Sequence, residues 1–167
     1  RMQSLVRPMA RVSLLAVGAS GAVPNALSTS RTSKPSVSIL CRPVSTTRAT
    51  ICTPPASVPG LIAELGARGT RAVVVLTAGL TREQKQAMLD AAKVHTLRIL
   101  GPNGLGLLSP AIGLNASFAH ASVGAGSLAF VSQSGALVSA MLDWGRSRGI
   151  GFSRFVSLGN KADVDEV

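Results

Sequence analysis

The chain has 167 residues, of which 46% are apolar and 14% charged, so it can bury a core and is not disordered throughout. Its formal charge of +10 suggests a polyanionic partner, but the first 63 residues carry seven basic residues and no carboxylate, whereas the remainder carries ten basic against seven acidic residues. Because only 3% of the residues are aromatic and no nucleic-acid-binding motif accompanies the charge, we expect no nucleic-acid partner.

The spacing of the cysteines and the length of the apolar runs indicate the redox compartment and whether a membrane-spanning segment is expected. Cys41 and Cys52 fit neither a zinc pattern nor a disulfide framework, so we expect buried thiols in a reducing compartment and a cytoplasmic protein. No apolar run reaches the roughly 20 residues that span a bilayer, so we expect no membrane partner. The Arg- and Ser-rich beginning is also compatible with an organelle transit peptide.

Residues 1–50 are rich in Ser, Thr, Arg and Pro, and "RVSLLAVGAS" is their one strand-like run. The next segment, "SVPGLIAELGARG", predicts a helix with Ser57 as its N-cap and Gly69 as its terminator. Its inward-facing residues are expected to be Leu61, Ile62 and Leu65. "TRAVVVLTAG" is continuously apolar and β-branched, which is typical of a strand covered on both faces.

The segment "TREQKQAMLDAAKV" opens with Thr81 and Gln84 at capping-box spacing and predicts a second helix. Its apolar face consists of Met88, Ala91, Ala92 and Val94. "LRILGPNGLGLL" follows as a short strand that runs into a Gly/Pro loop. Strands that alternate with helices at these lengths predict βαβ units and a parallel sheet.

Small, polar or Gly/Pro loops leave the carboxyl ends of the predicted strands, where parallel sheets bind ligands. These loops are Gly18–Ser20, Thr53–Pro55, Thr77–Gly79 and Gly101–Gly104. Each loop alone has an equally good structural explanation, since Gly and Pro end strands in many folds. Four such loops at one sheet edge favour a cofactor crevice.

"SLAFV" predicts a buried strand, and a helix begins at Gly135, because apolar residues recur at helical spacing after it. These apolar residues are Leu137, Val138, Met141, Leu142 and Trp144. Ser132 and Ser134 stand at the helix entrance, where backbone amides lack partners and the helix dipole favours negative charge. Gly135 leaves this end uncrowded, so the junction predicts a phosphate site.

Two other interpretations of this junction are open. Ser134 could simply cap a core helix. It could also be the nucleophile of a hydrolase, but that motif requires glycine where Ser132 and Ala136 stand, and His95 and His120 precede the serine rather than follow it. The sequence therefore disfavours a hydrolase.

Five ordered motifs carry a resemblance to a known family. They are "GPNGLGLLSP", "GLNASFA", "LAFVSQSGAL", "DWGRSRGIGFS" and "VSLGNKADVD". From about Ile51 to the last residue, the chain resembles the NDP-forming acyl-CoA synthetases. That family is related to the CoA-binding subunit of succinyl-CoA synthetase and shares its architecture with bacterial protein lysine acetyltransferases.

The resemblance implies an α/β chain, with a Rossmann-like CoA-binding domain over residues 1–121 and the start of a flavodoxin-like, succinyl-CoA-synthetase-type domain over residues 125–167. In such enzymes acyl-CoA and phosphate exchange through an acyl phosphate, and a phosphohistidine passes the phosphoryl group to a nucleoside diphosphate. The implied cofactor is CoA, with ATP/ADP and Mg²⁺ in the complete enzyme only. The implied partners are CoA or acyl-CoA, phosphate, and a nucleotide-grasp domain or subunit.

Carried over residue by residue, the resemblance also implies the site. The CoA-binding residues are Gly18, Ser20, Thr53, Pro54, Pro55, Thr77, Ala78, Gly79, Pro102 and Asn103. The phosphate-binding residues are Ser132, Ser134, Gly135 and Ala136. No catalytic or metal-binding residue is assigned, and the acidic cluster Asp163, Asp165 and Glu166 is expected to be a solvated loop.

Two departures from the family limit what we expect of this polypeptide. Neither His95 nor His120 lies in a segment like that of the family's phosphorylated histidine, so we expect that the chain alone does not complete the ligase cycle. Residues 20–50 lack the family's pattern, which suggests an out-of-frame or decayed version of the first half of the domain. The chain is therefore interpreted as a fragment of an acid–CoA ligase. The alternatives are a non-catalytic CoA-binding module, part of a protein lysine acetyltransferase, or a protein that has lost its function.

Overall fold

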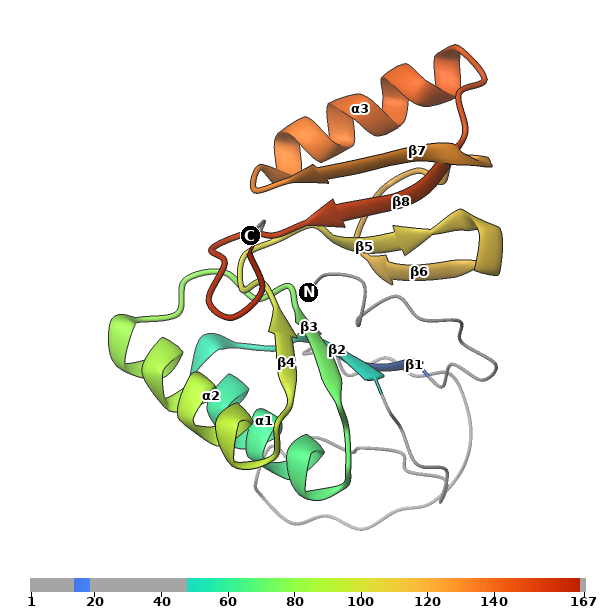
Figure 1. Ribbon diagram of the computed structural model, residues 1–167. Coiled ribbons are helices and arrows are strands. Elements are labelled where there is room, and N and C mark those ends of the chain that lie inside the picture. Colours follow the sequence, from blue (N-terminus) through green and yellow to red (C-terminus); the bar gives the residue numbers. More distant parts are fainter. Residues whose placement is uncertain (1–13, 19–47, 166–167) are drawn as a thin grey trace, which may run out of the picture.

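The computed structural model describes residues 14–18 and 48–165, which form two sheets with three α-helices (Figure 1). The first half contains β1 (Leu14–Gly18), β2 (Arg48–Cys52), η2 (Pro55–Ser57), α1 (Val58–Ala67), β3 (Ala72–Val75), α2 (Arg82–Val94) and β4 (Arg98–Leu100). The second half contains β5 (Gly106–Ser109), η3 (Pro110–Ile112), β6 (Leu114–Ser117), β7 (Ala125–Ser132), α3 (Gly135–Ser147) and β8 (Phe152–Ser157).

The first sheet is parallel throughout, in the order β1-β2-β3-β4, which confirms the predicted βαβ pattern. Figure 1 shows α1 and α2 side by side on one face of this sheet. Alternate strand residues such as Ile51, Val75 and Ile99 point to that face and are fully buried with Ile62 and Met88 of the helices. The intervening residues point to the opposite face, toward the second half of the chain.

The helix boundaries agree with the predicted caps, but two of the details differ. Thr81 and Gln84 form both hydrogen bonds of the capping box. Ser57 precedes α1 but its side chain does not cap it, because Ser57 is the last residue of η2 and already has helical backbone dihedrals. Its single hydroxyl proton faces two acceptors, the Pro54 carbonyl at 2.8 Å and Thr53 Oγ1 at 2.9 Å. Val94 is 78% exposed, so it was wrongly assigned to the apolar face, which the buried Met88 and Ala92 form.

The second sheet has the order β6-β5-β8-β7, in which β5 is antiparallel to β6 and β8 while β7 and β8 are parallel. We expected the segment around β5 to be a loop, and the β5–β6 hairpin was not anticipated. Both strands lie in the range 1–121 that the sequence assigned to the first domain, yet they pair within the second sheet. No helix of the described residues is long and apolar enough to cross a bilayer.

The buried face of α3 differs from the one that its largest residues suggest. Leu137 and Trp144 are 51% and 41% exposed, whereas Val138, Leu142 and Gly145 are buried. At Gly145 a Cβ atom would lie only 2.6 Å from Cε2 of Phe152, so the helix packs closely through its small residues. The strand "SLAFV" was also predicted to be buried, but the first residues of β7 are exposed, since β7 is the last strand of its sheet.

The two sheets are joined by an apolar cluster and by a segment that extends the first sheet. Leu100 of β4 packs with Val156 and Leu158. The segment 162–164 then runs along β4: Ala162 N–H donates to the Gly101 carbonyl at 3.0 Å, and Val164 N–H donates to the Ile99 carbonyl at 3.3 Å. The polypeptide that leaves the second sheet therefore covers the edge of the first.

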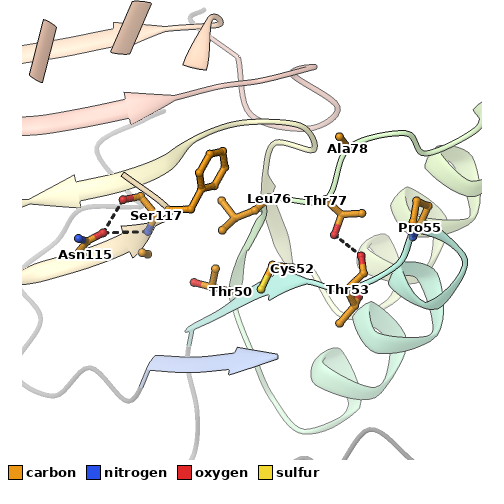
Figure 2. Close-up of a pocket in the computed structure, with 11 residues that line it drawn as sticks. Thr50, Cys52, Thr53, Pro55, Leu76, Thr77, Ala78, Asn115 and Ser117 are labelled. Atoms are coloured by element: carbon orange, nitrogen blue, oxygen red, sulfur yellow. Dashed lines mark hydrogen bonds between the residues drawn. The ribbon is translucent and has the colours of Figure 1, made fainter. Parts of the chain in front are cut away.

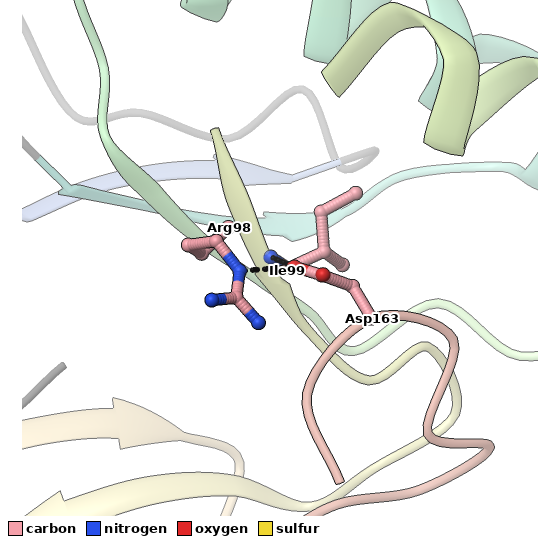
Figure 3. Close-up of polar contacts among 3 residues, drawn as sticks. All are labelled: Arg98, Ile99 and Asp163. Carbon is pink, nitrogen blue, oxygen red and sulfur yellow. Dashed lines mark hydrogen bonds and ion pairs between the residues drawn. The ribbon is translucent and has the colours of Figure 1, made fainter. Parts of the chain in front are cut away.

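Asp163 holds this segment in place (Figure 3). Its Oδ2 accepts from Ile99 N–H at 2.7 Å and from Arg98 Nε at 2.9 Å, and its side chain is 26% exposed. The expectation of a solvated acidic loop is thus wrong for Asp163, which has a structural role. Among the described residues no group of His, Cys, Asp and Glu is arranged to hold a metal ion.

Gly101 should be intolerant of any side chain. Its φ of +106° strains other residues, and an added Cβ would overlap the Val75 carbonyl oxygen, so Gly101→Ala is expected to cost about 3 kcal/mol or more. Gly113 also has a positive φ, of +65°, but open space around it, so Gly113→Ala should cost about 1 kcal/mol. Urea denaturation of both variants measures the difference, and equal costs would contradict this account.

Candidate functional site

The carboxyl ends of β2 and β3 border a cavity of about 600 Å³, here called the sheet cavity (Figure 2). Its opposite wall is the β6 strand and the residue that follows it. The lining residues are Thr50, Cys52, Thr53, Pro55, Leu76, Thr77, Ala78, Asn115, Ala116, Ser117 and Phe118. Of the four loops that the sequence placed at one crevice, those after β2 and β3 line this cavity. Thr50 and Leu76 also line it, so it extends along the face of the sheet opposite α1 and α2.

Hydrogen bonds fix the two loops that form the rim of the sheet cavity. Thr77 Oγ1 donates to the Thr53 carbonyl at 2.8 Å, which joins the loops after β2 and β3. Ser57 Oγ donates to Thr53 Oγ1 at 2.9 Å. Both threonines are buried. Their hydroxyls are therefore hydrogen-bonded within the protein.

A second cavity of about 650 Å³, the junction cavity, lies between the two halves of the chain. Its lining residues are Leu76, Ala78, Asn103, Gly104, Leu105, Phe118, Gln133, Ser134, Gly135, Ala136, Ser139, Gly159 and Asn160. Leu76, Ala78 and Phe118 line both cavities, so they form a shared partition between them. The predicted Asn103 and the predicted α3 entrance thus face the same space.

The α3 entrance has the geometry of a capped helix that also faces a cavity. Ser134 is the N-cap, and its Oγ accepts from Leu137 N–H at 3.3 Å. Ser132 Oγ accepts from Ser134 N–H at 3.1 Å. The amides of Gly135 and Ala136, as first residues of the helix, have no acceptor in the preceding turn. Capping and an exposed helix N-terminus therefore coexist at this junction.

The first turn of α2 shows that such an entrance stabilises negative charge in this fold. The backbone amide of Glu83 and then the Thr81 hydroxyl hydrogen-bond to the Glu83 carboxylate, and they lower its pKa. The α3 entrance offers the same kind of donors, with a cavity in place of a carboxylate.

Two asparagine side chains complete the junction cavity. Asn103 N–H donates to the Thr77 carbonyl at 3.0 Å, and Asn103 Nδ2 donates to Asn160 Oδ1 at 3.3 Å. Asn160 N–H donates to the Pro102 carbonyl at 2.8 Å. The sequence pointed to Asn103 but not to Gln133, Ser139, Gly159 or Asn160, although "GNK" at 159–161 lies in one of the quoted motifs.

The remaining predicted site residues, apart from those already described, do not line either cavity or lie outside the described residues. Gly18 ends β1 opposite Cys52, and Ser20 lies outside the described residues. Pro54, Gly79, Pro102 and Ser132 adjoin the cavities without lining them. Cys52 is exposed in the sheet cavity, which corrects the expectation of a buried thiol, because it is the last residue of its strand.

Neither cavity is lined by a charged side chain or by a histidine. His95 follows the end of α2, and His120 Nε2 lies 2.9 Å from Asp143 Oδ1 at the surface. The lining residues therefore offer hydroxyls, amides and backbone N–H groups. Such a set binds neutral polar groups and anions, and Cys52 is the only lining residue with an ionisable side chain.

Two family models match the chain. A CoA binding domain matches residues 22–110, and a succinyl-CoA ligase like flavodoxin domain matches residues 125–167. The first match begins at residue 22 and so extends across the segment 20–50 that we expected to lack the family's pattern.

The chain is similar to curated archaeal ligases. It is 40% identical to an ADP-forming acetate–CoA ligase of Methanocaldococcus jannaschii over 71% of this chain and 17% of the relative. It is 36% identical to an ADP-forming acetate–CoA ligase of Archaeoglobus fulgidus, over 77% of this chain and 20% of the relative. It is also 36% identical to the α subunit of an ADP-forming acetate–CoA ligase of Pyrococcus furiosus, over 77% of this chain and 29% of the relative. The chain thus spans less than a third of these relatives.

Solved structures show the same likeness. Acetyl-coenzyme A synthetase 1 of Candidatus Korarchaeum cryptofilum superposes with a TM-score of 0.71 at 38% identity, over 74% of this chain and 28% of that chain. The same protein in complex with phosphate and ADP gives a TM-score of 0.71 at 37% identity, over 75% of this chain and 28% of that chain. The expected link to bacterial acetyltransferases finds no support among these archaeal proteins.

Asp163 should stabilise the loop that carries Asn160 into the junction cavity. Asp163→Ala leaves Ile99 N–H without its acceptor and is expected to cost about 2 kcal/mol of unfolding free energy. Glu64 pairs with Arg68 in an exposed position, so Glu64→Ala should cost less than about 0.5 kcal/mol. Chemical denaturation of both variants is the measurement. If Asp163→Ala loses no more unfolding free energy than Glu64→Ala, the hydrogen bonds of the Asp163 carboxylate contribute little to stability.

Proposed function

The chain belongs to the NDP-forming acyl-CoA synthetase family, and from this premise we propose that it is the CoA- and phosphate-binding part of an acid–CoA ligase. One observation carries the proposal: the sheet cavity and the junction cavity share the partition of Leu76, Ala78 and Phe118. A single extended ligand can therefore lie in the sheet cavity and reach across the partition to the entrance of α3.

Coenzyme A has the chemistry that this arrangement suits. It is long, it carries apolar stretches between polar groups, and its thiol ends a flexible arm. The sheet cavity offers apolar walls together with a few polar atoms, a combination typical of cofactor sites. The loops after β2 and β3 bring backbone close to the ligand, because they consist of small residues and proline.

A phosphate or acyl phosphate would occupy the junction cavity in front of Gly135 and Ala136. Neutral amides and the helix dipole suit an anion that must bind and then leave, since they supply less attraction than a fixed cation. The related synthetase solved with phosphate and ADP is compatible with this assignment. Asn103 and Asn160 would add amide donors from the opposite wall.

In the proposed half-reaction, an oxygen of phosphate attacks the thioester carbonyl of acyl-CoA, the carbon–sulfur bond breaks, and acyl phosphate and CoA thiolate result. The residues of this chain would position the two reactants and stabilise the charge on the phosphate and carbonyl oxygens through N–H donors. In the complete ligase, ATP/ADP and Mg²⁺ would act with a nucleotide-grasp domain or subunit. We place the activity in the cytoplasm, a proposal that suits an exposed Cys52 thiol.

A binding module without catalysis is the second candidate. It is favoured by the lack of an ionisable group other than the Cys52 thiol among the residues that line the two cavities. The two candidates share the CoA site and differ in whether acyl groups are exchanged with phosphate.

Acetyl-CoA should protect Cys52 from alkylation, because Cys52 lines the sheet cavity and is exposed when the cavity is empty. At ten times the dissociation constant the rate should fall by about tenfold, in proportion to the unoccupied fraction. N-Ethylmaleimide labelling followed by peptide mass spectrometry locates and times the modification. Acetyl-CoA is used since it has no thiol to consume the reagent, and an unchanged rate at saturation would place CoA elsewhere.

Ser134→Asp should weaken phosphate binding without destabilising α3. Aspartate is a good N-cap, so the helix should stay intact, but its charge would repel a phosphate in the junction cavity and weaken binding by at least about tenfold. Thr81→Asp makes the same kind of change at the N-cap of α2, away from both cavities, and should leave binding unchanged. Calorimetry with inorganic phosphate compares them, and equal affinity of Ser134→Asp and the unmodified chain would refute the phosphate site.

A further inference from the structure

Phe118 differs from the other three phenylalanines of the chain, which pack together in the core of the second half. The ring centroids of Phe130 and Phe155 are 5.5 Å apart, and those of Phe152 and Phe155 are 4.2 Å apart. Phe118 belongs to none of the buried clusters of the described residues and is 64% exposed. Instead it lines both the sheet cavity and the junction cavity.

Hydrogen bonds hold the backbone on both sides of this ring. Phe118 N–H donates to the Leu105 carbonyl at 3.2 Å. Ser117 donates to Asn115 Oδ1 from its amide at 3.1 Å and from its hydroxyl at 2.6 Å, and Ser117 Oγ accepts from Ala119 N–H at 3.2 Å. The ring is therefore attached at a fixed point. One exposed apolar side chain on a protein surface needs no explanation, but an exposed ring that borders two cavities is available to a ligand.

The proposed half-reaction decides which part of the ligand meets the ring. A phosphate at the α3 entrance can attack the thioester carbonyl only if the two are in contact, so the acyl group must lie where the two cavities meet. The residues that the cavities share, Leu76, Ala78 and Phe118, are all apolar. Apart from Leu105 and Ala136, the other residues that line the junction cavity are polar or glycine. An apolar acyl chain therefore finds most of its contacts at the partition, where Phe118 is the largest side chain.

We propose that Phe118 is a specificity-determining residue, whose ring contacts the acyl group of acyl-CoA and limits the length of that group. The inference rests on the proposed CoA function and names the residue that selects among acyl groups. A short acyl group fits beside the ring, whereas a longer chain needs the space that the ring occupies. Because Leu76 and Ala78 follow β3 and Phe118 follows β6, the acyl group would lie between the two halves of the chain.

Phe118→Ala removes the ring and should change which acyl-CoA binds best. Each additional methylene that is buried among apolar groups raises the affinity about fourfold, so two methylenes in the freed space would raise it by at least about tenfold. Hexanoyl-CoA should therefore gain at least about tenfold in affinity relative to acetyl-CoA. Phe118→Leu keeps an apolar side chain of intermediate size and should give a smaller shift in the same direction.

The experiment measures the affinities of CoA, acetyl-CoA and hexanoyl-CoA by calorimetry for the unmodified chain and each variant. CoA has no acyl group, so its binding tests the proposed function by itself. Ile112→Ala is the matched control, because Ile112 is 50% exposed and lines neither cavity. This control should leave all three affinities unchanged. The thermal midpoint of each variant without ligand verifies that the fold is kept, as expected for exposed positions.

The outcomes separate the two proposals. If the unmodified chain binds CoA but Phe118→Ala shifts the affinity ratio of hexanoyl-CoA to acetyl-CoA by less than about fourfold, the effect of one methylene, the role of Phe118 is overturned while the CoA function stands. If Ile112→Ala shifts the ratio as much as Phe118→Ala does, the inference is also overturned. If the unmodified chain binds no CoA, both proposals fail. A larger shift toward hexanoyl-CoA in Phe118→Ala alone supports the inference.

Discussion

The two halves of the chain depend on the close contact between the segment that leaves β4 and the segment that leaves β8. A side chain on Gly159 would overlap the Pro102 carbonyl oxygen, and Ala162 N–H donates to the Gly101 carbonyl. The Asp163 carboxylate accepts from Ile99 N–H and Arg98 Nε at the outer edge of the first sheet. These contacts also satisfy backbone N–H and C=O groups that would otherwise need other hydrogen-bond partners. The segment that leaves β8 also carries Gly159 and Asn160, which line the junction cavity. The same contacts therefore hold the two halves together and position residues of the candidate site.

Local signals in the sequence were enough to predict the first half. The capping box of Thr81 and Gln84 and the apolar run of β3 specify their elements within a few residues, and a parallel sheet follows from their alternation. The loop residues Thr53, Pro55, Thr77, Ala78 and Asn103 could be predicted to border a crevice, because the carboxyl ends of parallel strands meet at one edge, and they do line the two cavities.

The second half could be predicted less well, because its elements depend on contacts distant in sequence. The β5–β6 hairpin is short and rich in glycine, so its residues resemble a loop until β8 pairs with β5. Large residues suggested the wrong face of α3, since Gly145 rather than Trp144 sets the contact with Phe152. Gln133 and Asn160 had no local sequence signal that would place them at a cavity. Their significance arises only when the opposite wall of that cavity is in place.

The partition between the two cavities has a mechanical consequence. Leu76 and Ala78 follow β3 in the first sheet, whereas Phe118 follows β6 in the second. A molecule that crosses the partition must contact both halves at once. Part of its binding free energy therefore stabilises the association of the two halves. Ligand binding would then determine whether the two halves unfold together or one after the other. The bound ligand would stabilise the fold in addition to being the molecule that the site binds.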